Sequence, residues 1–227
     1  MDKKVYYCIP TYKSFDHAYD GVLAALRGTI VPHKVIVIDN SGVGTGAAHL
    51  QPLTEKFANV FIWPQTRNLG VAGAWNKFHD EIKDDYVVIA NDDVAVHPHT
   101  LERLLATVEQ NPKEVLFAGS GNSGNAFSLF LLLRAGYEKI GGFDTNFYPA
   151  YYEDNDYALR ANLLGYTLTF ASDATYDHVG SSTIKRYTPQ EMEMHHNTFR
   201  RNTQYFISKW GGLPGETKYT EPFGGVI

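Results

Sequence analysis

Short runs of apolar, often β-branched residues recur along the first ninety positions of the chain. Four of them have the length of a strand and contain almost no polar residue, at 5–9, 35–38, 60–63 and 86–90. A strand with one face in water alternates apolar and polar residues, whereas a strand covered on both faces does not. The pattern therefore predicts four buried strands of a parallel sheet.

Between these runs, apolar residues recur at spacings of three and four, as in a helix with one buried face. The pattern predicts helices over about 18–28, 47–57 and 71–82, and a fourth helix with Pro98 in its first turn that stops at Asn111-Pro112. Strands and helices thus alternate four times. This order predicts a doubly wound α/β sheet with right-handed crossovers.

The second half of the chain has a different character. Apolar runs at 115–118, 127–133 and 167–171, with a helical stretch at about 155–164, predict a mixed extension of the sheet. A last helix is expected from Thr188, where Thr188-Pro189-Gln190-Glu191 forms a capping box with proline at the first helical position, to Trp210. Residues 213–227 have little pattern.

Composition narrows the class of protein. The 227 residues include 20 Lys+Arg and 25 Asp+Glu, a formal charge of −5 that argues against a nucleic-acid partner. The length and the 44% of apolar residues suit a large buried core. Cys8 has no possible disulfide partner, and no run approaches the roughly 18 apolar residues of a membrane span. We therefore expect a cytoplasmic protein without a transmembrane segment.

Polar clusters follow each of the four predicted strands. Since ligands bind open parallel sheets at the carboxyl ends of the strands, these clusters are expected to face one crevice. Each cluster alone is also typical of ordinary turns and helix caps. The four clusters are Pro10-Thr11-Tyr12, Asp39-Asn40-Ser41, Arg67-Asn68-Leu69-Gly70 and Asn91-Asp92-Asp93.

Three further motifs come later in the chain: Gly141-Gly142-Phe143-Asp144, Glu153-Asp154-x-Asp156-x-x-x-Arg160 and Lys209-Trp210-Gly211. With the strand-end clusters, and in this order, they resemble the inverting glycosyltransferases of the GT-A fold, in particular family 2 with its rhamnosyl- and glucosyltransferases. The resemblance spans roughly residues 4–211.

The resemblance implies a single GT-A, Rossmann-like α/β domain. Its mostly parallel central sheet is flanked by helices, with a mixed extension on the acceptor side and a C-terminal helix. A nucleotide-binding half would cover about 1–95, an acceptor and catalytic half about 96–212, and a tail 213–227. The end of the chain is also compatible with excision from a longer protein with further domains.

The resemblance further implies a divalent cation, Mn²⁺ or Mg²⁺. Asn91-Asp92-Asp93 resembles the DxD motif with Asn91 in place of the first acid, so Asp93 is the expected metal ligand and Asp92 is expected to face the donor. His178 resembles a late metal-binding histidine of the family, although a structural histidine is the alternative. A hard cation held by carboxylates suits a leaving diphosphate.

Eight residues are expected to bind the nucleotide. An Asx-turn is the alternative to nucleotide binding for Asp39. For the small residues around Gly70 the alternative is close helix packing. Arg67 would add a positive charge at the nucleotide end of the donor. The eight residues are Pro10, Thr11, Tyr12, Asp39, Arg67, Asn68, Gly70 and Asp92.

Inversion in a single displacement needs a base that takes the proton of the acceptor hydroxyl. Asp154 matches the family's base, and a helix N-terminus would favour its ionised form. Glu153 and Tyr152 are expected to contact the acceptor sugar. The alternative for Asp154 is a helix cap, with Asp156 and Arg160 as an i,i+4 pair.

An aromatic cluster and a group of basic residues can each be interpreted as ligand-binding or as structural. Only part of the aromatic cluster before Asp154 is expected to bind sugar, because aromatic residues are more often core: Phe143, Phe147, Tyr148, Tyr151 and Tyr152. The basic residues of the last helix could meet phosphates, but a solvated helix face is the favoured interpretation: His195, His196, Arg200, Arg201 and Lys209.

The expected function is transfer of a sugar from a nucleoside-diphosphate sugar to a hydroxyl of a glycan acceptor. A UDP-sugar is the first expectation for the donor and dTDP-rhamnose the next. Two alternatives stay open. A catalytically silent nucleotide- or carbohydrate-binding domain of a larger protein would explain Asn91. A sugar nucleotidyltransferase is the other, although no glycine-rich basic loop follows the first strand.

Overall fold

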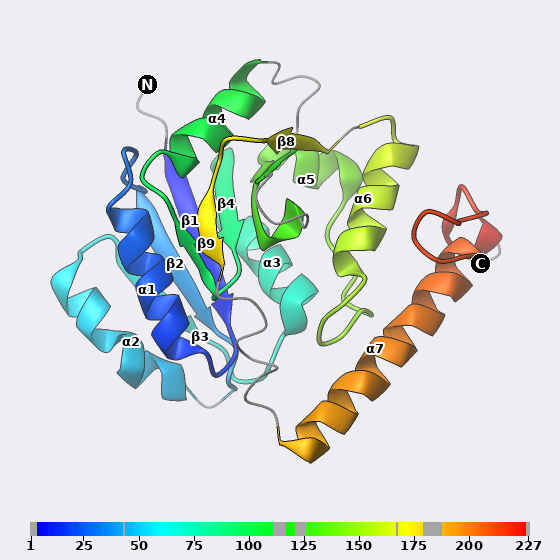
Figure 1. Ribbon diagram of the computed structural model, residues 1–227, viewed down its shortest axis with the longest axis horizontal. Helices are drawn as coiled ribbons and strands as arrows, with labels where there is room; N and C mark the ends of the chain where they lie inside the picture. Colours follow the sequence, from blue (N-terminus) through cyan, green and yellow to red (C-terminus); the bar gives the residue numbers. More distant parts are fainter. Residues whose placement is uncertain are drawn as a thin grey trace.

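A central sheet with helices on both faces forms the body of the protein (Figure 1). The computed structural model describes residues 4–42, 44–110, 117–120, 126–166, 168–178 and 188–225. Within these ranges the main sheet has seven strands in the order β3-β2-β1-β4-β7-β6-β8. The four predicted strands are confirmed as its parallel part: β1 (Val5–Thr11), β2 (Lys34–Asp39), β3 (Val60–Pro64) and β4 (Tyr86–Ala90).

The other three strands form the predicted mixed extension. The fully buried β7 (Leu129–Leu133) runs antiparallel to β4 and to β6 (Phe117–Ser120), and β8 (Thr169–Ala171) runs parallel to β6. Residues 115, 116 and 167 of the predicted runs lie outside the described ranges. The parallel part of the sheet therefore ends at β4, and the antiparallel β4–β7 pair joins it to the mixed part.

A second, small sheet was not predicted. It pairs β5 (Val94–Val96) with β9 (Tyr176–His178) in antiparallel fashion, with Val94 opposite His178. Strands of three residues are too short to show a periodicity of their own. The pairing matters because it brings residue 178 next to the end of the Asn91-Asp92-Asp93 motif.

The helices cover the two faces of the sheet in separate hydrophobic clusters. One cluster holds the buried faces of α1 (Phe15–Leu26), α2 (Thr45–Lys56) and α4 (Thr100–Gln110). The other holds those of α3 (Gly70–Glu81), α5 (Arg134–Ile140) and α6 (Glu153–Leu163). Figure 1 shows α1 and α2 on the opposite side of the sheet from α3 and α6.

The fourth helix differs slightly from its prediction. It begins at Thr100, so Pro98 precedes it and does not lie in its first turn. Thr100 N bonds back to His97 O, at 3.1 Å, where the chain turns into the helix. Its predicted stop at Asn111-Pro112 lies outside the described ranges.

The last helix, α7 (Pro189–Trp210), lies at the edge of the molecule on the side away from α1 and α2 (Figure 1). The predicted capping box is confirmed, since Thr188 and Glu191 each bond the other's backbone N–H. After the helix the chain folds back, and Lys218 N and Tyr219 N both donate to Trp210 O, at 2.9 and 3.1 Å. Across the described ranges, no helix is both long and apolar enough to cross a membrane.

Candidate active site

Hydrogen bonds join the polar clusters at the carboxyl ends of the strands. Thr11 Oγ1 donates to Asp92 Oδ2 at 2.8 Å, which links β1 to the turn after β4. Asn40 N donates to Thr11 O at 2.9 Å, and Asn40 Oδ1 accepts from Leu69 N at 3.0 Å. The prediction that the clusters meet is confirmed, because residues up to 81 positions apart are in direct contact.

The Asp92 carboxyl has an unusual environment. Burial is the largest cause that raises its pKa, to about 7, and the charge of Asp93 adds to it, whereas the Thr11 hydroxyl lowers it. Near neutral pH the Asp92 carboxyl, which lies next to Asp93 in the pair, is therefore only partly ionised. A cation beside the pair would favour full ionisation, because an opposite charge stabilises carboxylates.

The small sheet brings the backbone of the two predicted metal ligands into the same region. Asp93 directly precedes Val94, and Val94 lies opposite His178 in the β5–β9 ladder. The side chain of His178 and the motif residues Val179 and Gly180 lie outside the described part. Among the described side chains, no group of three or more His, Cys, Asp or Glu could hold a metal. The adjacent carboxyl groups of Asp92 and Asp93 are of the oxygen-ligand type that a hard cation prefers, and metal binding by Asp93 and His178 stays a prediction.

Asp39 has a structural role at the end of β2. It is completely buried, its Oδ1 accepts from Ser41 N at 2.9 Å, and its Oδ2 accepts from Gly46 N at 2.9 Å. The first bond is the Asx-turn that the sequence left as an alternative, and the second fixes the first turn of α2. Contact of Asp39 with a nucleotide stays a prediction.

The start of α3 is packed closely against a later loop. Asn68 Oδ1 accepts from Gly70 N at 2.8 Å, and Val71 N donates to Pro149 O at 2.7 Å. Gly70 has φ +71°, and a Cβ there would lie 2.9 Å from Pro149 O. Close packing, the alternative to nucleotide binding, therefore explains the glycine at position 70. The packing partner is the loop at Pro149 and not a helix.

The remaining predicted nucleotide residues lie around the same strand ends. Pro10 is half-buried and Tyr12 is exposed, with the Lys13 ammonium 5.1 Å from the centre of the Tyr12 ring. Arg67 is exposed, and its backbone lies against Gly42. Exposed side chains beside the crevice are free to meet a ligand.

A cavity of about 410 Å³ opens beside these strand ends. Asn91, from the end of β4, and Glu153 and Asp154, from the first turn of α6, line it together. The strand-end motif and the predicted base thus border one space. The rest of its lining is mostly apolar: Val71, Trp75, Phe127, Ala150, Tyr151, Tyr152, Asn155, Phe199 and Pro214.

Asp154 is not the cap of α6. Tyr152 occupies the N-cap position, with φ +75° and no side-chain capping bond, and Asp154 Oδ1 accepts from Asn155 N at 2.8 Å. Burial raises the pKa of the Asp154 carboxyl, and the backbone hydrogen bonds only partly offset this. The expected effect of the helix terminus is thus outweighed by burial. A carboxylate with a raised pKa is a stronger base.

Glu153 lies in the cavity wall with its carboxyl group almost completely covered. The residue is 6% exposed, and its Oε2 has no hydrogen-bond partner among the described residues. Burial, followed by the charge of Asp154, raises the pKa of Glu153 to about 8. The carboxyl is therefore mostly neutral at pH 7 and can donate a hydrogen bond to a ligand oxygen.

The predicted aromatic cluster divides into two parts. Phe143 and Phe147 are buried in the core, and Tyr148 is 43% exposed but does not line the cavity. Tyr151 and Tyr152 do line it. Only the last two are therefore placed to touch a sugar.

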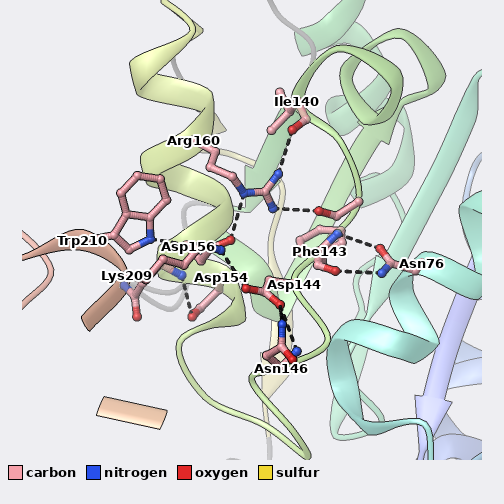
Figure 2. Close-up of polar contacts among 12 residues, drawn as sticks. Asn76, Ile140, Phe143, Asp144, Asn146, Asp154, Asp156, Arg160, Lys209 and Trp210 are labelled. Carbon is pink, nitrogen blue, oxygen red and sulfur yellow. Dashed lines mark hydrogen bonds and ion pairs between the residues drawn. The ribbon is translucent and has the colours of Figure 1, made fainter. Parts of the chain in front are cut away.

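A buried ionic network behind the base joins α6 to α7 (Figure 2). The completely buried Asp156 pairs with Arg160 at 2.9 Å, the i,i+4 pair of the alternative interpretation, and with Lys209 at 2.6 Å. Lys209 also pairs with Asp144 at 2.7 Å, and Trp210 Nε1 donates to Asp156 at 2.9 Å. The prediction of a solvated face is wrong for Lys209, because two carboxylates draw its ammonium inside.

Two asparagines that the sequence analysis did not assign hold the loop before α6. Asn76 exchanges two hydrogen bonds with the backbone of Phe143, at 2.7 and 2.8 Å. Asn202 Nδ2 donates to Ala150 O at 2.7 Å from a completely buried position. A signal for Asn202 was present, since it shares the helical spacing of Phe206 and Trp210, and a polar residue on an apolar stripe needs a partner inside.

The family model for glycosyl transferase family 2 matches residues 6–163, more than half of the 227 residues. The chain therefore belongs to glycosyl transferase family 2. A curated relative, a galactofuranosyl glycosyltransferase of Leishmania donovani, is 34% identical over 122 residues, which cover 43% of this chain and 27% of that protein. The chain thus spans about a quarter of the relative's length.

Solved structures show the same fold. Mannosyltransferase PcManGT from Pyrobaculum calidifontis, in complex with GDP-Man and Mn²⁺, has a TM-score of 0.67 at 16% identity, over 80% of this chain and 59% of that one. S. aureus TarS 1–349, in complex with UDP, has a TM-score of 0.61 at 13% identity, over 76% and 59%. The match thus covers less than two thirds of either structure. The predicted GT-A fold is confirmed.

Proposed function

We propose that this protein is a metal-dependent inverting glycosyltransferase, which moves a sugar from a nucleoside-diphosphate sugar to a hydroxyl of a glycan. One observation carries the proposal. Asn91 of the strand-end motif lines the same cavity as Glu153 and Asp154, so a donor at the strand ends and an acceptor at α6 would meet there.

The residues divide the work of a single displacement. Asp154 takes the proton of the acceptor hydroxyl, and the hydroxyl oxygen forms a bond to the anomeric carbon. The bond from that carbon to the diphosphate breaks, and the diphosphate leaves with the electron pair. A Mn²⁺ or Mg²⁺ ion held by Asp93 and His178 would offset the charge of the leaving diphosphate.

A UDP-sugar is the first donor to test, with dTDP-rhamnose next. Support for uridine comes from TarS, whose structure holds UDP, whereas PcManGT holds GDP-Man. The galactofuranosyl relative adds galactofuranose to the sugars worth testing. We propose a cytoplasmic location and a glycan acceptor as well.

Thermal unfolding tests the donor site, because a ligand that binds only the folded protein raises the melting temperature. Wild type and Asp93→Ala would be melted with UDP, GDP, dTDP or CMP, each with Mn²⁺ or with EDTA. One nucleotide should stabilise the wild type with Mn²⁺ only, and the variant not at all. If no nucleotide shifts the wild type, the proposal fails.

Transfer is then measured with sugars of the nucleotide that binds. NMR of the product reports the anomeric configuration, which should be opposite to that of the donor. A product that keeps the donor's configuration would contradict inversion, and with it the role of Asp154.

A further inference from the structure

The cavity beside Asp154 is lined by residues from inside and from outside the segment that the family model matches. Asn91, Glu153 and Asp154 belong to the segment that the family model matches, residues 6–163. Phe199 of α7 and Pro214 after it also line the cavity, and both lie beyond that segment. Residues outside the matched part therefore shape the place where the acceptor would bind.

Phe199 is an exposed aromatic side chain at this cavity. It is 44% exposed, and its ring centre lies 5.5 Å from that of Tyr151 and 5.5 Å from that of Tyr152. The Tyr152 ring also packs on the buried Phe206, with ring centres 5.4 Å apart. The cluster is thus supported from the core while Phe199 keeps an open apolar surface.

Polar contacts of residues further along α7 fix the position of this helix relative to the base. Asn202, one turn further along α7, holds Ala150 O at 2.7 Å, and Thr203 Oγ1 donates to Tyr152 Oη at 3.0 Å. The Lys209 network fastens the end of the same helix to α6 (Figure 2). Few side-chain rearrangements are then needed when a ligand binds, which favours affinity.

The chemistry of the cavity suits an uncharged sugar. Aromatic rings offer an apolar surface to the C–H face of a sugar ring, and the carboxyl oxygens of Glu153 and Asp154 accept hydrogen bonds from its hydroxyls. An anionic group on that sugar would be repelled by ionised Asp154. The two arginines of α7 do not line the cavity, and they bond elsewhere, Arg200 to Asn197 and Arg201 to the Tyr148 carbonyl.

We infer that Phe199 stacks on the acceptor sugar, and that α7 with the segment after it selects an uncharged sugar residue as the acceptor. This inference rests on the proposed function and deepens it. It assigns acceptor choice to a part of the chain outside the family match, whereas the donor site lies within that match.

Binding of simple glycosides to the folded protein tests the inference. The probes are the methyl glycosides of galactose, glucose and mannose and methyl glucuronide, titrated by saturation-transfer NMR in the presence of the nucleotide that stabilises the protein. Wild type is compared with Phe199→Ala, Phe199→Trp and Phe170→Ala, a matched control at an exposed phenylalanine on β8.

Phe199→Ala should weaken binding of the preferred neutral glycoside roughly fivefold, the order expected for loss of one aromatic contact. Phe199→Trp should bind it about as well as the wild type, because the ring surface is kept. Phe170→Ala should bind it unchanged. All four proteins should keep the same nucleotide-dependent rise in melting temperature.

Three results would overturn the inference: no neutral glycoside binds the wild type, Phe199→Ala binds it as the wild type does, or the glucuronide binds as tightly as the glucoside. Each of them leaves the donor-site result in place, so the proposed function can stand when the inference falls. A wild type that no nucleotide stabilises would instead contradict the proposed function itself.

Discussion

The Lys209 ammonium, on the last turn of α7, lies 2.6 Å from the carboxylate of Asp156, on the first turn of α6. Asp156 is two residues after Asp154, and residues at this spacing point to different sides of a helix. The ion pair therefore supports the catalytic turn from behind while Asp154 lines the cavity in front.

Lys209→Met is expected to destabilise the protein strongly. The variant leaves the completely buried Asp156 and the partly buried Asp144 with less compensating charge, and breaking a buried pair typically costs about 3–5 kcal/mol of unfolding free energy. Urea unfolding measures the change. Lys77→Met is the matched control, because Lys77 pairs with Glu81 at the surface, at 3.4 Å, and such a pair contributes roughly 0.5 kcal/mol or less. Equal losses in the two variants would contradict a structural role for the network.

Asp154→Asn should abolish transfer and keep the donor site. The amide cannot take the acceptor proton, so turnover is expected to fall on the order of 10²- to 10⁴-fold. The nucleotide-dependent rise in melting temperature should remain. Since burial raises the pKa of Asp154, the acidic limb of the wild-type kcat/KM profile should lie above the ordinary aspartate range. Asp173→Asn, at an exposed carboxyl after β8, is the control, and unchanged turnover in Asp154→Asn would remove this residue from the mechanism.

Much of the fold was predictable from local patterns, since uniformly apolar runs define the four parallel strands. The small sheet was not, because three-residue strands depend on a partner eighty residues away for their existence. The residues of the candidate site also divide into those that the sequence predicts and those that only the fold reveals. Motif residues such as Asp93 and Asp154 were found by type and order, whereas Phe199 is an ordinary surface aromatic until folding brings it against Tyr151 and Tyr152.

Lys209 shows why the unpredicted part was missed. A lysine near the end of a helix normally reaches into water, and the motif Lys209-Trp210-Gly211 did not indicate that its ammonium is buried. Only the folded chain reveals that Asp144 and Asp156 converge on its ammonium from two other segments. Burial of a charge is decided by such distant partners, so local periodicity does not reveal it.

Gly70→Ala is expected to lose more stability than Gly44→Ala. Both glycines have positive φ, +71° and +67°, so alanine pays a backbone cost of about 1–2 kcal/mol at each. Only at Gly70 would the new Cβ also meet the Pro149 carbonyl, at 2.9 Å, while nothing lies within 4 Å at Gly44. Urea unfolding of both variants measures the difference, and similar losses would show that the loop at Pro149 yields readily.

The neutral state of Glu153 gives the protein a pH-dependent stability. With a folded pKa of about 8 against an ordinary value of 4.5, the folded state binds more protons than the unfolded state between these values. The contribution of Glu153 is therefore fully present at low pH and is lost as the pH rises toward 8.

Glu153→Gln removes this titration and keeps the shape of the side chain. Relative to the variant, the wild type should lose up to about 1.4 kcal/mol of unfolding free energy per pH unit between pH 5 and 8. Urea unfolding of both proteins at pH 5, 6, 7 and 8 gives the difference directly, and Glu138→Gln on the exposed side of α5 controls for loss of a carboxyl group. A difference between wild type and Glu153→Gln that stays constant over this range would mean that Glu153 is ionised in the cavity wall, where it could accept a hydrogen bond from a sugar hydroxyl but not donate one.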